Sequence, residues 1–213
     1  MAGTITGLVI QKRNKERVNV FLDGEFAFGL ALTHALGLHK GQHLSDEDLQ
    51  RLQALDEVEV ARETALNYLS YRPRSTSEVR AKLSEKGYSE AAIETAINRL
   101  TEVGLLDDAA FARFWLDNRD RFKPRGARAL RFELHQKGIP DDIINLVLED
   151  LDESEAAYRA AHGRMARYAQ ADQQTFNKKL GDFLARRGFS YDIIRDVLDR
   201  LWAETQNDNV HDD

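Results

Sequence analysis

The 213-residue chain is 42% hydrophobic and 31% charged, with 13 glycines and 3 prolines, a composition that predicts a folded, helix-rich protein. It contains no cysteine, which excludes disulfides, thiolate metal sites and thiol catalysis and suits a reducing cytoplasm. The net charge of −6 disfavours a uniformly basic nucleic-acid binder. The longest apolar run near the start is Leu8–Ile10, too short for a signal-peptide core or a membrane span. We therefore expect a cytoplasmic protein that does not contact a membrane.

The first segment, residues 1–45, predicts a small β-rich extension. Three short antiparallel strands are expected at Ile5–Arg13, Arg17–Leu22 and Glu25–Gly29. The dipeptide Asp23-Gly24 between the last two is typical of a tight hairpin turn. A three-stranded sheet is marginal alone, so its apolar face needs a cover, to which a short helix at Thr33–Leu38 is expected to contribute.

A connecting helix is predicted at residues 46–60. Ser45 can cap its first turn, and Asp48 stands three residues later, where an acidic partner of the cap is favoured. Beyond this point the sequence carries almost no strand pattern.

The remainder of the chain repeats one unit three times. Each copy contains the phrase Leu-x-x-(Lys/Arg)-Gly-apolar, beginning at Leu83, Leu134 and Leu184. Apolar residues recur six, ten and thirteen positions after each glycine, a spacing that puts them on one face of a helix. Self-similarity at this period is typical of helical repeat proteins.

Each repeated glycine is interpreted as the left-handed residue that ends a helix, with the preceding Lys or Arg facing the negative end of the helix dipole. A further helix precedes each pair, which makes three helices a unit. The expected fold is therefore mainly α, with three tandem three-helix repeats in an elongated curved array behind the N-terminal antiparallel β element. The predicted boundaries are 61–108, 109–152 and 153–205 for the repeats and 206–213 for a disordered acidic tail.

No catalytic constellation is found in the sequence. A phosphate-binding glycine loop is missing, which disfavours nucleotide hydrolysis. His34, His39 and His43 are interpreted as surface and turn histidines, because no His-Glu-x-x-His helix accompanies them. The paired carboxylates at 107–108 and 141–142 stand near predicted helix starts, where a capping role is expected. We predict a protein that is not an enzyme and needs no cofactor or metal.

Positive charge is concentrated in the middle of the chain. Residues 61–140 carry 15 basic and 11 acidic side chains, whereas both flanking segments are acidic. The inter-helix loops 71–75 and 123–126 place cations at the same point of repeats one and two, which favours a surface for an anionic partner. A merely solvated charged face is the alternative. The candidate binding residues are Arg72, Arg74, Arg80, Lys82, Arg121, Lys123, Arg125, Arg128, Arg131 and Lys137.

Several ordered phrases give the chain a family resemblance: Ala65–Ser75, Glu78–Leu83, Lys86–Tyr88, Gly104–Ala112 and Glu133–Ile139. With the threefold repeat, they make residues 60–205 similar to the RecX family of regulators of the RecA recombinase. The third repeat matches mainly through Phe183–Phe189, and the first 55 residues resemble the β-rich extension of some members.

The resemblance implies an inhibitor that docks in the helical groove of the RecA filament on single-stranded DNA, and we expect the protein to be a monomer. There it would reduce ATP hydrolysis, strand exchange and co-protease activity, and so act in homologous recombination, DNA repair and the SOS response. The RecA filament is the implied partner, and single-stranded DNA is a further one.

Two alternatives from other classes stay open. Helix, glycine turn and helix can be interpreted as a helix-turn-helix of a DNA-binding regulator, although the second helices, at 89–101, 141–151 and 191–202, carry much acid and few cations. The other is a scaffold whose basic surface meets an acidic protein without nucleic acid.

Overall fold

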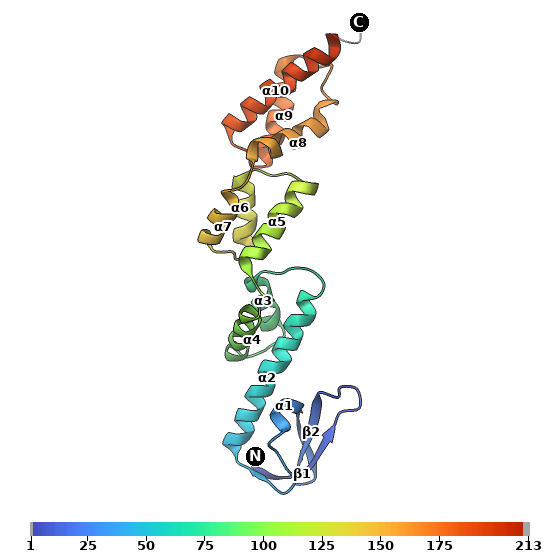
Figure 1. The fold of residues 1–213 in the computed structure, drawn as a ribbon, viewed down its shortest axis with the longest axis vertical. Helices are drawn as coiled ribbons and strands as arrows, with labels where there is room; N and C mark the ends of the chain where they lie inside the picture. The colour runs from blue at the N-terminus through green and yellow to red at the C-terminus, as the bar shows by residue number, and fades with distance from the viewer. Residues whose placement is uncertain (1, 211–213) are drawn as a thin grey trace. The chain divides into compact units, whose positions relative to one another are not determined.

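The computed structural model describes residues 2–210 and divides into two compact units, Met1–Leu106 and Asp107–Asp213 (Figure 1). The described part is mostly helical, with a small antiparallel sheet in the first unit and three three-helix repeats, which confirms the predicted fold class.

The first unit begins with an antiparallel sheet of strand order β3-β2-β1-β4. The strands are β1 (Gly3–Ile10), β2 (Arg17–Leu22), β3 (Glu25–Ala31) and β4 (His43–Leu44). Positive φ angles at Asp23 (48°) and Gly24 (94°) form the predicted tight turn between β2 and β3. The short helix α1 (Leu32–Ala35) follows β3. The two-residue β4 was not predicted, because it depends on pairing with the distant start of β1.

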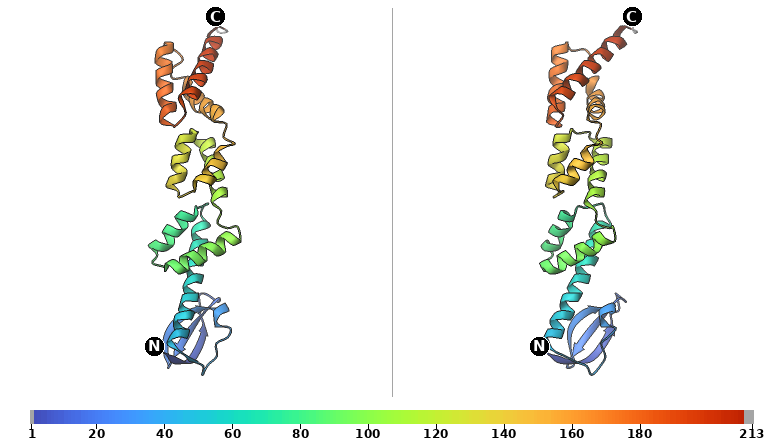
Figure 2. Two further views of the ribbon diagram at one scale, coloured as in Figure 1. Left: turned by 90° about the vertical axis from the view of Figure 1, so that its left-hand side faces the viewer. Right: turned by 60° about the vertical axis from the view of Figure 1, so that its left-hand side comes forward.

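Helix α2 (Asp46–Leu69) covers the apolar face of the sheet (Figure 2). Its buried Leu49 and Leu52 join Ile5, Val20 and Leu30 of the strands in one hydrophobic cluster. The predicted cap is confirmed, since the Ser45 side chain accepts a hydrogen bond from the Asp48 N–H and the Asp48 carboxylate accepts one from the Ser45 backbone N–H. Hydrogen bonds from Ser45 lower the pKa of Asp48.

The predicted connecting helix and the first helix of repeat one are one continuous element, so the expected boundary at 60/61 lies inside α2. No glycine or proline stands between residues 46 and 69 to interrupt it. The C-terminal half of α2 packs on α3 (Thr76–Glu85) and α4 (Glu90–Glu102) to form repeat one. The sheet and the first repeat therefore share a helix.

The second unit holds the other two repeats. Repeat two consists of α5 (Asp108–Phe122), α6 (Ala127–Gln136) and α7 (Asp141–Leu148), and repeat three consists of α8 (Glu153–Met165), α9 (Gln173–Arg186) and α10 (Tyr191–Val210). Each repeat has its own apolar cluster, built from the positions that recur in the sequence.

The acidic tail expected to be disordered from residue 206 differs in the structure, because α10 continues to Val210. Leu201 and Thr205 are buried, and no glycine or proline interrupts residues 191–210. The rest of the expected tail, 211–213, lies outside the described residues.

The three repeated glycines have the predicted left-handed conformation, with φ of 85° at Gly87, 73° at Gly138 and 87° at Gly188. In each copy the N–H of the next residue donates to the carbonyl five residues earlier, at 3.4, 3.1 and 3.3 Å. This pattern satisfies carbonyl groups at the helix end and fixes the turn to the next helix.

Candidate interaction surface

The ten predicted binding residues divide between the two units. Repeat one carries Arg72, Arg74, Arg80 and Lys82, and repeat two carries Arg121, Lys123, Arg125, Arg128, Arg131 and Lys137.

In the α2–α3 loop of repeat one, both arginines have internal partners. Arg72 forms a two-pronged pair with Glu78, with nitrogen–oxygen distances of 3.0 and 3.3 Å. The guanidinium carbon of Arg74 lies 3.8 Å from the centroid of the Tyr68 ring. These contacts hold the loop against α2 and α3, and the ion pair with Glu78 leaves less of the Arg72 charge for a partner.

The two cations on α3 are also paired. Arg80 donates to Glu90 at 2.8 Å and to Glu94, both on α4. The hydrogen bond with Glu94 raises the pKa of Arg80 and lowers that of Glu94. Lys82 lies 2.9 Å from Glu85, and this hydrogen bond lowers the pKa of Glu85. All four predicted residues of repeat one thus have acidic or aromatic partners within their own repeat.

Repeat two is different at the corner between α5 and α6. Helix α5 ends at Phe122, and its C-cap Lys123 bonds through its N–H to the carbonyl of Arg119 at 2.8 Å. Arg121, Lys123 and Arg128 are all exposed, and none makes an ion pair or side-chain hydrogen bond within residues 2–210. We call these three residues the exposed cation group.

Exposed aromatic rings accompany this group. Phe122 is 80% exposed and Phe132, one helical turn after Arg128 on α6, is 62% exposed. Large rings left in solvent beside unpaired cations are typical of surfaces that bind a partner.

Arg125 has a structural role in the same loop. Its Nε lies 2.9 Å from an oxygen of Glu133, a carboxylate on α6 whose side chain is only 12% exposed. The other oxygen of Glu133 accepts hydrogen bonds from Arg119 Nε and Trp115 Nε1, each at 2.7 Å. Glu133 therefore fixes the loop to α5 and α6. The exposed cation group is attached to this fixed part of the structure.

The last two predicted residues are held on α6. Arg131 lies 3.8 Å from Asp141 at the start of α7. The Nζ of Lys137, the C-cap, lies 5.2 Å from the Trp115 ring centroid. The six predicted cations of repeat two thus lie on α5, on α6 and its C-cap, and in the loop between the helices, and within the described residues Arg121, Lys123 and Arg128 are the unpaired ones.

Sequence reasoning missed Arg187, which comes from repeat three. Its Nη1 donates to the carbonyl of Pro124 at 2.9 Å, and its own carbonyl accepts from the Gly126 N–H at 3.0 Å. The third repeat therefore holds the α5–α6 loop through two hydrogen bonds. Arg187 belongs to the repeated Lys/Arg-Gly phrase, and the acidic total of its repeat obscured that signal.

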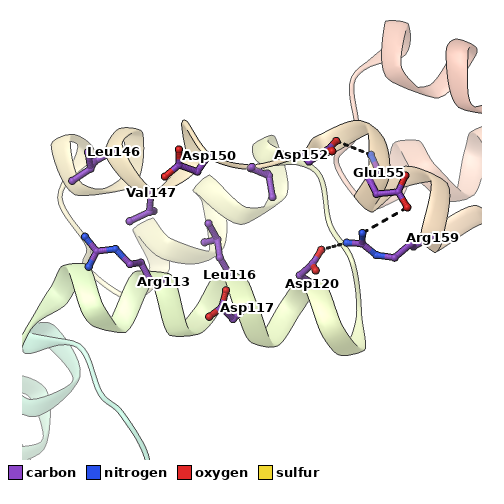
Figure 3. A pocket seen from close by; sticks show the side chains of 11 residues that line it. Arg113, Leu116, Asp117, Asp120, Leu146, Val147, Asp150, Asp152, Glu155 and Arg159 are labelled. Carbon is purple, nitrogen blue, oxygen red and sulfur yellow. Dashed lines mark hydrogen bonds and ion pairs between the residues drawn. The ribbon is translucent and has the colours of Figure 1, made fainter.

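A separate cleft of about 530 Å³ lies between α5, α7 and α8 (Figure 3). Leu116 and Val147 are among its apolar lining residues, and most of its charged lining is acidic. Asp120 pairs with Arg159, which also lies 3.9 Å from Glu155, so part of this charge is neutralised within the cleft. Its lining contains no Ser, Cys, His or Lys that could serve as a nucleophile.

Among the described residues, no group of three or more His, Cys, Asp or Glu side chains is placed to hold a metal ion. In the same part of the chain, every helix is too short or too polar to cross a lipid bilayer.

The fold and this surface define the class of protein: a helical repeat protein with an N-terminal antiparallel sheet and an exposed cationic corner. Family models match it in order: the regulatory protein RecX N-terminal domain over residues 3–45 and the first, second and third RecX three-helix domains over 61–100, 107–148 and 152–198. The chain belongs to the RecX family of regulatory proteins.

Individual relatives agree with the family models. The regulatory protein RecX of Clostridium botulinum (strain Eklund 17B / Type B) is 36% identical over 91% of this chain and 94% of its own length. That of Bacillus subtilis (strain 168) is 34% identical over 96% and 79%. A crystal structure of a regulatory protein RecX superposes with a TM-score of 0.77 at 28% identity, covering 92% of this chain and 99% of the other. RecX from Lactobacillus salivarius gives 0.63 at 29% identity, covering 69% and 97%.

Proposed function

We propose that this protein binds the RecA recombinase filament and negatively modulates its ATPase, strand-exchange and co-protease activities. Membership of the RecX family supports the regulatory role. The observation that carries the choice of surface is the exposed cation group, Arg121, Lys123 and Arg128, which lacks internal counter-ions in the described chain.

A filament assembled on DNA carries a dense array of phosphates. Cations that are already paired inside a protein gain little from such a partner, whereas unpaired cations gain Coulomb attraction and accelerate encounter. The ion pairs of Glu133 also favour binding, because a loop that is already held in place loses less conformational entropy when a partner binds. Phe122 on α5 and Phe132 on α6 provide exposed apolar contact area on the same helices.

The direct test is the DNA-stimulated ATPase of the RecA protein from the same organism, measured with increasing amounts of this protein. The ATPase rate is expected to fall. A rate that stays unchanged at a large excess of this protein contradicts the proposal.

The surface is tested with the triple variant Arg121→Gln, Lys123→Gln and Arg128→Gln, which should inhibit markedly less. The matched control is Lys12→Gln, Arg13→Gln and Lys15→Gln in the β1–β2 loop. These three residues are also exposed and make no ion pair in the described structure, so the control removes the same charge elsewhere. Equal inhibition by the two triple variants places the contact elsewhere.

The alternative function, direct action on DNA, is favoured by one observation. Exposed rings beside cations can stack unpaired bases while the cations meet the phosphates, as single-strand binding proteins do. Salt-dependent binding of a single-stranded oligonucleotide without RecA, together with an unchanged RecA ATPase, would support this alternative.

A further inference from the structure

The contact between repeats two and three gathers three arginines from distant parts of the sequence. Arg125 lies in the α5–α6 loop, Arg164 in the last turn of α8, and Arg187 at the end of α9. The guanidinium carbons of Arg164 and Arg187 lie 4.2 and 4.6 Å from the centroid of the buried Phe183 ring. Arg187 also bonds to the carbonyl of Pro124, next to Arg125.

Positive charge is in excess at this contact. Arg125 has an ion-pair partner, Glu133, but it shares that carboxylate with Arg119. Arg164 has neither an ion pair nor a hydrogen bond to another side chain in the part of the chain that the structure describes. Burial, and then the charges of Arg164 and Arg125, lower the pKa of Arg187, which nevertheless remains charged at neutral pH.

An anion would relieve this repulsion. The Nη1 group of Arg187 donates to the Pro124 carbonyl. The other N–H groups of its side chain have no acceptor among the described residues. Arg164 is exposed, so a ligand can reach it from solvent. Guanidinium groups present planar pairs of donors that match the oxygens of a phosphate group.

We propose that Arg125, Arg164 and Arg187 form a phosphate-binding site at the junction of repeats two and three, which we call the arginine junction. The phosphate of a nucleic-acid backbone is the favoured ligand, because Lys123 of the exposed cation group lies in the same α5–α6 loop as Arg125, and Arg121 and Arg128 flank that loop on α5 and α6. The proposal rests on the proposed function, in which this surface contacts a filament that carries DNA. The arginine junction would give the acidic third repeat a direct part in binding.

The experiment uses the full-length protein with Arg164→Gln, since Arg164 can be changed without breaking the Pro124 contact. Lys178→Gln is the matched control, because Lys178 is exposed and lines a different groove, between α9 and α10. Binding of a fluorescein-labelled single-stranded oligothymidylate is followed by fluorescence anisotropy over a series of salt concentrations. A second arm measures the rise in melting temperature produced by sodium phosphate and by pyrophosphate.

Arg164→Gln is expected to weaken oligonucleotide binding about three- to tenfold and to reduce the slope of log affinity against log salt by about 0.7. Lys178→Gln should leave both values close to wild type. If Arg164→Gln instead abolishes the melting-temperature rise with phosphate but leaves oligonucleotide binding intact, the site takes free phosphate.

No effect of Arg164→Gln in either arm overturns the site. If the variant then still weakens inhibition of the RecA ATPase, the ligand is an acidic protein surface, and the phosphate proposal is likewise overturned. Because the ATPase assay of the exposed cation group is read separately, failure of the arginine junction leaves the proposed function standing.

Discussion

A Cβ atom placed on Gly126 would clash with the carbonyl group of Gly188, so the start of α6 and the end of α9 pack backbone against backbone. Gly126 has an ordinary φ of −72°, so it is needed for space rather than for conformation. The contact joins repeats two and three directly beside the exposed cation group.

Gly126→Ala is therefore expected to destabilise the protein by about 1–3 kcal/mol, because backbone atoms must move apart. The control is Gly163→Ala in α8, where an added Cβ meets nothing within 4 Å and should stabilise the helix by up to about 1 kcal/mol. Thermal unfolding followed by circular dichroism measures both. Equal melting temperatures for the two variants would show that the contact is not tight in solution.

The second prediction concerns Glu133. Glu133→Gln removes the ion pairs with Arg119 and Arg125 and leaves their charges without a partner, so unfolding should become easier by about 2–3 kcal/mol. Glu149→Gln on an exposed turn is the control. Denaturant unfolding measures stability. An unchanged midpoint for Glu133→Gln would contradict the role of this carboxylate in holding the loop.

The third prediction separates the two groups of cations. Replacing Arg72, Arg80 and Lys82 with Gln should affect inhibition of the RecA ATPase less than replacing the exposed cation group, because the former are paired with Glu78, Glu94 and Glu85. The readout is the concentration of protein that halves the ATPase rate. A larger shift from the repeat-one variant would contradict the distinction.

The fourth prediction is a pH dependence at Glu59, which joins α2 to α4. Burial alone would raise the pKa of Glu59, but the hydrogen bonds and charges of Arg62 and Arg99 outweigh it and lower the pKa below the ordinary 4.5. A carboxyl whose pKa is lower in the folded state stabilises it above the ordinary pKa and loses this contribution as the pH falls through the folded value.

Glu59→Gln should consequently unfold more easily than wild type by about 1–2 kcal/mol at neutral pH, and the difference should shrink as the pH falls below the ordinary pKa. Glu63→Gln on the same helix is the control, since no ion pair is found for it in the described structure. A stability difference that persists unchanged in acid would rule out the ionised carboxylate as its source.

Local signals in the sequence predicted the fold well. The glycines at 87, 138 and 188 mark helix ends through their own backbone preference, and the turn at 23–24 fixes a hairpin through two neighbouring residues. The missed strand β4 has only two residues and is defined by a distant partner. The unbroken α2 could have been predicted, because nothing in 46–69 interrupts a helix.

The candidate surface was harder to predict, because the availability of a cation depends on tertiary neighbours. Arg80 and Arg128 are both arginines on the second helix of their repeats. Arg80 pairs with carboxylates of the next helix, whereas Arg128 pairs with none in the described chain. Sequence alone does not indicate that a carboxylate 14 positions away will pair with Arg80, because the pair forms only when α3 and α4 pack together. The same limitation concealed Arg187, which reaches repeat two from 63 positions beyond Pro124.

Helix α2 has a mechanical consequence for the N-terminal extension. At 1.5 Å per residue its 24 residues span about 36 Å, with the sheet packed on the first half and repeat one on the second. No flexible joint separates the two, so a force or torque applied to the sheet passes along one stiff rod into the first repeat. The N-terminal sheet and the first repeat are therefore expected to move together as one rigid element.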